Sequence, residues 1–176
     1  LIAYLSKKNR SFPIGLSGIT GIGYILTGGI SPLSRQYGLA IDNIVEIQGI
    51  WGNGDQFKLI KPTLRSSEEE KFMWRGLCGA SAFLAIVTNI KLETQEEKSI
   101  YIWDSYLRPN QLADLIIKAE SWPNNASLCW SWQNKIRAIG IFEIQDSLNL
   151  KEIEHIINSL PKSIDSTKYI IPGLRE

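Results

Sequence analysis

The feature that most constrains the fold is an uncharged, glycine-rich stretch of 24 residues that runs from Ser11 to Ser34. A stretch of this length is long enough to cross a bilayer as a helix. It contains six glycines and two prolines, however, which disfavour a helix interior by about 1 and about 3 kcal/mol each. We therefore expect a loop buried around a ligand, and no membrane span.

The same stretch leads directly into a run of residues with a specific order. From Gly21 to Asn43 the chain reads Gly-Ile-Gly-Tyr-Ile-Leu-Thr-Gly-Gly-Ile-Ser-Pro-Leu-Ser-Arg-Gln-Tyr-Gly-Leu-Ala-Ile-Asp-Asn. This run resembles the second half of the FAD-binding domain in the vanillyl-alcohol oxidase / p-cresol methylhydroxylase family, nearest to its berberine-bridge-enzyme-like branch. Members of that branch read Gly-Gly-Gly-x-Gly-x-Leu-Ser-Arg-x-Tyr-Gly-Leu-x-x-Asp-Asn here.

A second block of the sequence supports the resemblance. From Trp74 to Thr88 the chain reads Trp-Arg-Gly-Leu-Cys-Gly-Ala-Ser-Ala-Phe-Leu-Ala-Ile-Val-Thr. It is similar to the family's Trp-x-x-Leu-Arg-Gly, a Gly/Ala-rich run and Phe-Gly-Ile-Val-Thr. The family also has a hairpin between the two blocks, and residues 44–61 have the pattern of one. Three features thus occur in the family's order over about half of the chain.

Periodicity and turn residues predict the elements along the chain. The hairpin of Ile44–Lys61 should turn tightly, in a primed turn, at Asn53-Gly54. The pattern Ser67-x-x-Glu70 is a capping box and predicts a helix that runs through Leu77. The remaining predicted elements are helices at Leu1–Asn9, at Ser34–Gly38, from Pro109 onward and from a cap at Asn149 to Pro161, and strands at Ala85–Glu93, Ser99–Leu107, Ala126–Gln133, Lys135–Ile144 and Tyr169–Ile171.

Together these elements predict an α+β fold with two parts. The composition changes at Thr94–Lys98, which places the boundary there. The resemblance implies that residues 1–94 form the second lobe of a PCMH-type FAD-binding domain. Residues 95–176 then follow the order strand, helix, strand, strand, helix, strand, which predicts a ferredoxin-like βαββαβ portion of the substrate domain.

Glycines suit a flavin site because they have no β-carbon and tolerate positive φ, so that main-chain amides can approach and turn toward a ligand. The resemblance places FAD along the main chain of several residues. These cofactor-binding candidates are Gly21, Gly23, Gly28 and Gly29 along the flavin, and Ile86 and Val87 near the adenine end. The alternative interpretation is that the glycines only form tight turns between buried strands.

Two charged residues, Arg35 and Asp42, lie inside the motif. They would either lie near the cofactor's edge or fix the loop by hydrogen bonds to main chain, and we favour the second interpretation. Tryptophans and tyrosines of the chain are expected in the core more often than as ring-stacking groups. The residues concerned are Tyr24, Tyr37, Trp74, Trp103, Trp130 and Trp132.

The sequence also departs from the family pattern. Thr27 and Ser31 replace glycines of the first block, Cys78 replaces an arginine, and Ala85 replaces the glycine before Ile-Val-Thr. Each change adds a β-carbon or removes a charge where the cofactor should approach. They support an alternative hypothesis, a degenerate non-catalytic scaffold that serves protein interaction or binds another small ligand.

Other chemistries find little support in the composition. The net charge of +1 gives no field for nucleic acid or an anionic membrane. Two distant cysteines, Cys78 and Cys129, provide neither a metal site nor a disulfide framework, and buried free thiols fit a cytoplasmic protein. The single histidine, His155, is expected to face solvent. No catalytic residue can be assigned by motif.

The resemblance therefore predicts FAD-linked oxidation of an alcohol, amine or sugar-like substrate in a full-length protein. The lobe of the family that carries the pyrophosphate loop and often a flavin-linking histidine would precede Leu1. That N-terminal FAD lobe is thus the expected partner, and this chain alone should be inactive. A second, cysteinyl link to flavin has no counterpart, because the corresponding residues are Leu16-Ser17-Gly18.

Overall fold

The computed structural model describes residues 1–15, 21–161 and 166–172. Leu16-Ser17-Gly18, the counterpart of the cysteinyl-link position, lies outside the described residues. The chain divides into two compact units: Phe12–Gln95, and Leu1–Ser11 together with Glu96–Glu176. We call them the glycine-loop unit and the four-stranded unit. Among the described residues no helix is long and apolar enough to span a membrane.

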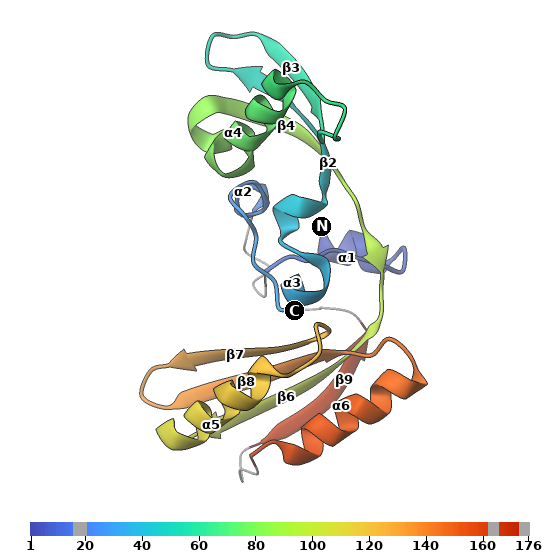
Figure 1. The fold of residues 1–176 in the computed structure, drawn as a ribbon, viewed down its shortest axis with the longest axis vertical. Helices are drawn as coiled ribbons and strands as arrows, with labels where there is room; N and C mark the ends of the chain where they lie inside the picture. The colour runs from blue at the N-terminus through green and yellow to red at the C-terminus, as the bar shows by residue number, and fades with distance from the viewer. Residues whose placement is uncertain (16–20, 162–165, 173–176) are drawn as a thin grey trace. The chain divides into compact units, whose positions relative to one another are not determined.

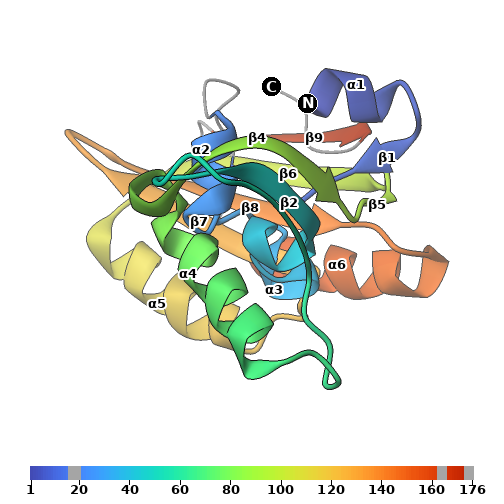
Figure 2. The same cartoon turned by 90° about the horizontal axis from the view of Figure 1, so that it is seen from above.

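The glycine-loop unit contains short helices followed by a three-stranded antiparallel sheet and a long helix (Figure 1). The strand order is β3-β2-β4, and Figure 2 shows β2 and β4 side by side. Buried Ile44 and Ile47 of β2 anchor the sheet in the core. The elements are α2 (Ile22–Leu26), α3 (Ser34–Tyr37), the 3-10 turn η1 (Ala40–Asn43), β2 (Ile44–Trp51), β3 (Gln56–Ile60), α4 (Glu68–Leu84) and β4 (Ala85–Leu92).

The hairpin between β2 and β3 confirms the predicted strands but corrects the predicted turn. The Gly54 amide donates to the Trp51 carbonyl at 2.9 Å, so Gly52 and Asn53 are the central residues, and neither has a positive φ. Gly54 instead follows the turn, with a φ of +94°. This is a three-residue loop in which the glycine supplies a left-handed bulge, and no primed turn at Asn53-Gly54 forms. The prediction was wrong because one additional residue lies inside the loop.

Helix α4 begins where the capping box predicted. The Glu70 amide donates to the Ser67 hydroxyl at 3.1 Å, and the Glu70 carboxylate accepts from the Ser67 amide at 2.8 Å. These two bonds satisfy amides that have no partner within the first turn. The helix is interrupted by non-helical backbone at Cys78 and Gly79 before it reaches Leu84.

The four-stranded unit has the predicted alternation of strands and helices, and its antiparallel strands lie in the order β7-β8-β6-β9. Helices α5 and α6 lie on the same side of this sheet (Figure 1). Trp103 of β6, Leu115 of α5 and Ile153 of α6 are buried in the core between the layers. The elements are α1 (Ile2–Ser6), β1 (Arg10–Ser11), β6 (Ser99–Leu107), α5 (Pro109–Glu120), β7 (Ala126–Trp132), β8 (Ile136–Glu143), α6 (Ser147–Ser159) and β9 (Thr167–Pro172), and the short strand β5 (Gln95–Glu96) pairs with β1.

The first eleven residues group with the four-stranded unit, whereas the sequence pattern predicts that they belong to the domain of residues 1–94. Two hydrogen bonds connect these segments across a long sequence separation. The Glu97 amide donates to the Asn9 carbonyl at 3.0 Å, and the Ser6 hydroxyl donates to the Glu97 carboxylate at 3.3 Å. Such long-range bonds leave no local pattern in the sequence. The functional identities predicted for 1–94 and 95–176 stay predictions.

Helix α6 begins earlier than predicted. The Asn149 amide donates to the Asp146 carboxylate at 2.8 Å, so Asp146 provides the cap and Asn149 lies within the first turn. The Asn149 side-chain carbonyl accepts from Asn125 at 2.9 Å and from the Gln145 amide at 3.1 Å. Asp146 and Asn149 are both good cap residues, and only the tertiary bond to Asn125 separates their roles.

The aromatic residues divide between core and surface. Trp74 and Trp103 are buried, as expected, whereas Trp130 is 50% exposed and Trp132 is 65% exposed. The core prediction was wrong for these two because burial falls along β7 from Ala126 to Trp132, and both tryptophans lie in the half of the strand next to the turn into β8. Tyr24 and Tyr37 are half-buried. His155 is exposed, as predicted.

Candidate functional site

Two of the predicted flavin-binding glycines lie at the start of helix α2. Gly21 is the residue before the helix, with φ −80° and ψ −179°, and Gly23 lies within it. Both are exposed, and a β-carbon built on either would have no neighbour within 4 Å. Neither position requires glycine for its backbone conformation. What both provide is a stretch of main chain that a ligand can approach without meeting a side chain.

The other two glycines follow the helix and both have positive φ, +132° for Gly28 and +72° for Gly29. Their carbonyls accept hydrogen bonds from the amides of Ile41, at 3.0 Å, and Ala40, at 2.9 Å. A β-carbon on Gly29 would lie 2.5 Å from that of Ala40, whereas one on Gly28 would meet nothing within 4 Å. Gly29 is therefore required for packing, and Gly28 faces open space.

Two departures from the family pattern are accommodated inside the loop. The Thr27 hydroxyl donates to the Gly23 carbonyl at 3.0 Å, so that side chain turns back along α2. Ser31 is only 5% exposed, and its hydroxyl accepts from the Leu33 amide at 3.2 Å. Both hydroxyls are thus bonded to the loop's own main chain. Neither residue covers the open side at Gly28.

Asp42 and Asn43 fix the loop by hydrogen bonds to main chain, the role that the sequence favours for Asp42. The Asp42 carboxylate accepts from the Leu39 amide at 2.9 Å. The buried Asn43 amide donates to the carbonyls of Tyr37 and Leu39, each at 2.9 Å. These bonds connect α3 with η1 and with the start of β2. Arg35 lies exposed in α3.

Ile86 and Val87, the candidates for the adenine end, lie on the sheet of the same unit and not on the glycine loop. Ile86 is 71% exposed and Val87 is half-buried on β4, where they pair with Ile50 and Gly49 of β2. Gly28 and Gly29 are held by η1, whereas Ile86 and Val87 are held by the sheet. Helix α4 packs against α2 and continues directly into β4, and so connects the glycine loop with the sheet.

The other two departures from the family pattern, Cys78 and Ala85, lie in or at the end of helix α4. Cys78 is half-buried at the interruption of α4, and Ala85 ends that helix. Burial, together with the smaller effect of the Asp42 carboxylate, raises the pKa of the Cys78 thiol to about 11, although Lys61 acts in the opposite direction. Burial also raises the pKa of Cys129. Both thiols are therefore protonated at neutral pH and are poor nucleophiles. Among the described residues no three His, Cys, Asp or Glu side chains gather into a metal-binding group.

Sequence reasoning missed a polar cluster on the four-stranded unit. Arg137 lies opposite Tyr106 in the β6–β8 register, and its Nε and Nη2 donate to the Asp104 carboxylate at 3.0 and 2.6 Å. Tyr169 of β9 lies opposite Ile102 on the same face of β6 and is 46% exposed. By strand alternation this face is opposite to that of Trp103, which the helices cover. The only sequence signal for this cluster was the pair of polar residues at the alternating positions 104 and 106. Their pairing with Arg137 depends on the register of β6 and β8, which the sequence does not show.

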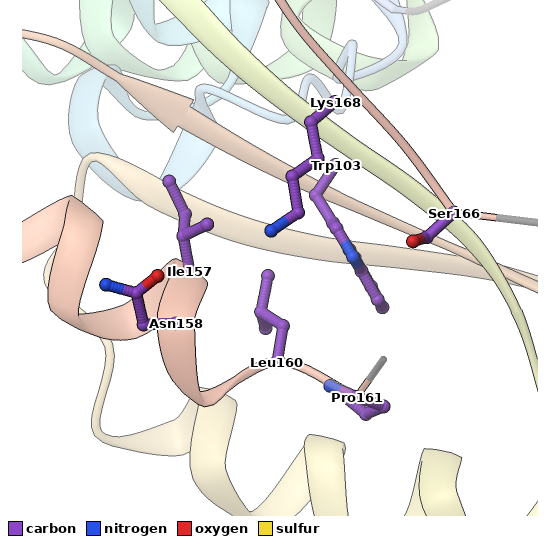
Figure 3. Close-up of a pocket in the computed structure, with 7 residues that line it drawn as sticks. All are labelled: Trp103, Ile157, Asn158, Leu160, Pro161, Ser166 and Lys168. Carbon is purple, nitrogen blue, oxygen red and sulfur yellow. The ribbon is translucent and has the colours of Figure 1, made fainter. Parts of the chain in front are cut away.

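A hollow of about 300 Å³ lies on the helix side of the same sheet (Figure 3). Trp103, Ile157 and Lys168 point toward it from β6, α6 and β9. Pro161 and Ser166 also line it, and they border residues 162–165, which lie outside the described chain. We therefore assign no site to this hollow.

The mixed α/β structure matches the fold of FAD-binding oxidases. The solved structure of a chitooligosaccharide oxidase has a TM-score of 0.76 to this chain, with 17% identity, and the match covers 98% of this chain and 37% of that chain. No family model matches the sequence.

The relatives by sequence define the class more closely. FAD-linked oxidoreductase nodO of Hypoxylon pulicicidum is 34% identical over 109 residues, which cover 58% of this chain and 23% of the relative. Berberine bridge enzyme-like 24 of Arabidopsis thaliana is 39% identical over 89 residues, which cover 49% of this chain and 15% of the relative. The chain is thus homologous to FAD-linked oxidoreductases and berberine bridge enzyme-like proteins, which confirms the predicted resemblance. It spans about a quarter or less of the length of these curated relatives.

Proposed function

We propose that this chain is the part of a longer FAD-linked oxidoreductase that contacts the flavin and begins the substrate domain. The observation that carries the proposal is the open side of Gly28. This residue has a positive φ and no neighbour within 4 Å of a built β-carbon, in a chain homologous to FAD-linked enzymes. A ligand can therefore lie directly against its main chain.

The described residues fit FAD in the following way. The main chain of Gly21, Gly23 and Gly28 would lie along the flavin. Gly29 would hold the loop against Ala40. The start of β4, at Ile86 and Val87, would lie near the adenine. Bound FAD supplies two-electron oxidation of the substrate carbon, and the protein supplies position and electrostatics. The side chains of Thr27 and Ser31 leave this surface open because they bond to their own loop.

The four-stranded unit would be the ferredoxin-like portion of the substrate domain. Its order of elements and its strand order, β7-β8-β6-β9, support this assignment. The face opposite to the helices carries Asp104, Tyr106, Arg137 and Tyr169, and we assign the substrate side to it. The substrate class that accompanies the resemblance is an alcohol, an amine or a sugar-like carbon.

The partner we propose is the N-terminal lobe of the FAD domain in the complete protein. The glycine-loop unit exposes several large apolar side chains that a partner lobe could cover. Phe83 is 92% exposed, Phe72 is 77% exposed and Ile86 is 71% exposed, all on α4 and the strand that follows it. A further lobe seated there would bury them and complete the cofactor cradle. We accordingly expect no turnover from this chain alone.

The first test is a visible spectrum of the protein expressed from its complete reading frame, recorded before and after acid precipitation. A flavin absorbance in the supernatant would indicate non-covalent FAD, and one that stays in the pellet would indicate a covalent link. A colourless protein that also fails to bind added FAD would contradict the proposal. It would favour the alternative hypothesis, a non-catalytic scaffold for protein interaction or another ligand.

The second test addresses Gly28. Gly28→Val in the same full-length protein should abolish flavin retention, because the side chain would project into the open side where the cofactor is proposed to lie. Gly54→Val is the matched control: Gly54 also has a positive φ and an open β-carbon position, but lies in the loop between β2 and β3. Flavin content, measured per folded protein, should fall only in the Gly28 variant. Equal flavin content in both variants would remove Gly28 from the site.

A further inference from the structure

A polar hollow of about 360 Å³ lies at the end of the four-stranded unit where β7 turns into β8. Six residues line it, namely Tyr106, Ser131, Gln133, Asn134, Lys135 and Arg137. Its volume is within the range of small-molecule sites. Every lining residue carries a hydrogen-bonding group, and none is acidic.

The two cations of the hollow are held in place by neighbouring groups. Arg137 is oriented by Asp104, which accepts from both Nε and Nη2, and its guanidinium carries further N–H donors on Nη1. Lys135 Nζ lies 5.5 Å from the centre of the Tyr106 ring, within the range of a cation–π contact. The ammonium and the guanidinium are therefore presented toward the same hollow by one aromatic ring and one carboxylate.

The charge balance indicates what the hollow can accept. Lys135 and Arg137 contribute two positive charges, and the Asp104 carboxylate paired with Arg137 offsets one of them. A surplus of about one positive charge matches a monoanion and opposes a cation. A carboxylate also fits the planar donor set of a guanidinium, and the amides of Gln133 and Asn134 and the hydroxyl of Ser131 suit a hydroxylated body.

We propose that this hollow is a binding site for the carboxylate end of a small polyhydroxylated molecule. The site is formed entirely by the four-stranded unit and does not depend on the flavin function proposed above. If both proposals hold, the ligand of the substrate side is an acidic molecule and not an amine.

The test uses the 176-residue chain and three six-carbon polyols that differ only in their terminal group: gluconate, sorbitol and glucamine. Each is titrated at low ionic strength while amide chemical shifts are recorded by NMR. Gluconate should shift the amides of residues 131–137, with an affinity about tenfold or more above that of sorbitol, and glucamine should shift none of them. Added salt should weaken the gluconate effect because these charges are exposed.

Variants separate a specific site from general attraction to positive charge. Lys135→Gln should reduce the gluconate affinity about tenfold and leave the melting temperature unchanged, since its side chain is exposed. Lys151→Gln removes the same charge from the exposed surface of α6 and should leave binding as it was. Equal binding of gluconate and sorbitol, tighter binding of inorganic phosphate, or equal losses in the two variants would each overturn the proposal.

Discussion

Single residues in the glycine-loop segment have separable roles. Gly29 and the buried Asn43 hold the loop together, the first by close approach to Ala40 and the second through two main-chain carbonyls. Gly28 has an open side and is the residue where a ligand role can be tested. The glycines of one motif therefore divide between packing and candidate binding. The sequence pattern alone could not make that division, because it does not show which β-carbon would meet a neighbour.

The Cys78 thiol allows a prediction at this scale. Its pKa of about 11 means that roughly 100-fold less thiolate is present at pH 8 than for a thiol at the ordinary value of 9.0. In a Cys129→Ser background, alkylation of the folded chain by iodoacetamide at pH 8 should be slower by about that factor than alkylation of the denatured chain. The rate should continue to rise as the pH increases toward 11. Equal rates in the folded and denatured chains would contradict the buried environment.

The same pKa shift predicts the direction of a change in stability. The folded-state pKa of Cys78 lies above the unfolded value, so the stabilising contribution is complete below pH 9. As the pH rises from 9 to 11, the unfolded chain loses its proton first and the free energy of unfolding falls. Denaturant titrations of the Cys129→Ser protein at pH 8 and 10, compared with the Cys78→Ser/Cys129→Ser double variant, measure this effect. An unchanged difference between the two proteins would contradict it.

Secondary-structure elements were predicted best where local chemistry determines their ends. Ser67 and Glu70 fix the start of α4, and Pro109 fixes the start of α5. Elements were predicted less well where two local solutions compete. Asp146 and Asn149 are both good caps, and Gly52, Asn53 and Gly54 all favour turns, so tertiary contacts and loop length decided between them.

The capping box yields the prediction at the scale of elements. Ser67→Ala should lower the free energy of unfolding by about 1 kcal/mol, because the Glu70 amide loses its acceptor at the helix start. Ser67→Asp should retain most of the stability, since its carboxylate can accept the same bond and is favoured by the helix dipole. Urea denaturation followed by circular dichroism distinguishes these variants. A loss as large for aspartate as for alanine would show that the hydroxyl acts in some other way.

At the scale of the whole molecule, the chain folds as two compact units, and one of them is discontinuous in sequence. Leu1–Ser11 groups with Glu96–Glu176, so the glycine-loop unit, Phe12–Gln95, is inserted between the segments of the other unit. The four-stranded unit has its own core around Trp103 and Phe142. A discontinuous unit of this kind depends on contacts between its ends, here the bonds of Glu97 with Asn9 and Ser6.

This arrangement predicts the effect of removing the first eleven residues. The deletion should raise amide hydrogen exchange at Glu97 and the adjoining start of β6, because the partners of Glu97 are lost. Exchange in the β2–β4 pair should stay as in the full chain, since those strands belong to the other unit. Hydrogen exchange resolved by mass spectrometry measures both regions. Equal acceleration in the two units would contradict the grouping.

The sequence by itself determined the family resemblance, the identity of nearly every element and the role of Asp42 in fixing the glycine loop. These properties depend on local order, such as glycine spacing, alternation and cap chemistry, which act over a few residues. Only the tertiary structure decided that Trp130 and Trp132 are exposed, that the N-terminal residues join the four-stranded unit, and that Arg137 meets Asp104 beside Tyr106. Each of these depends on how far the packing extends along a strand and on which distant residues pair. Register and strand order are set by contacts between distant segments, and no local pattern records them.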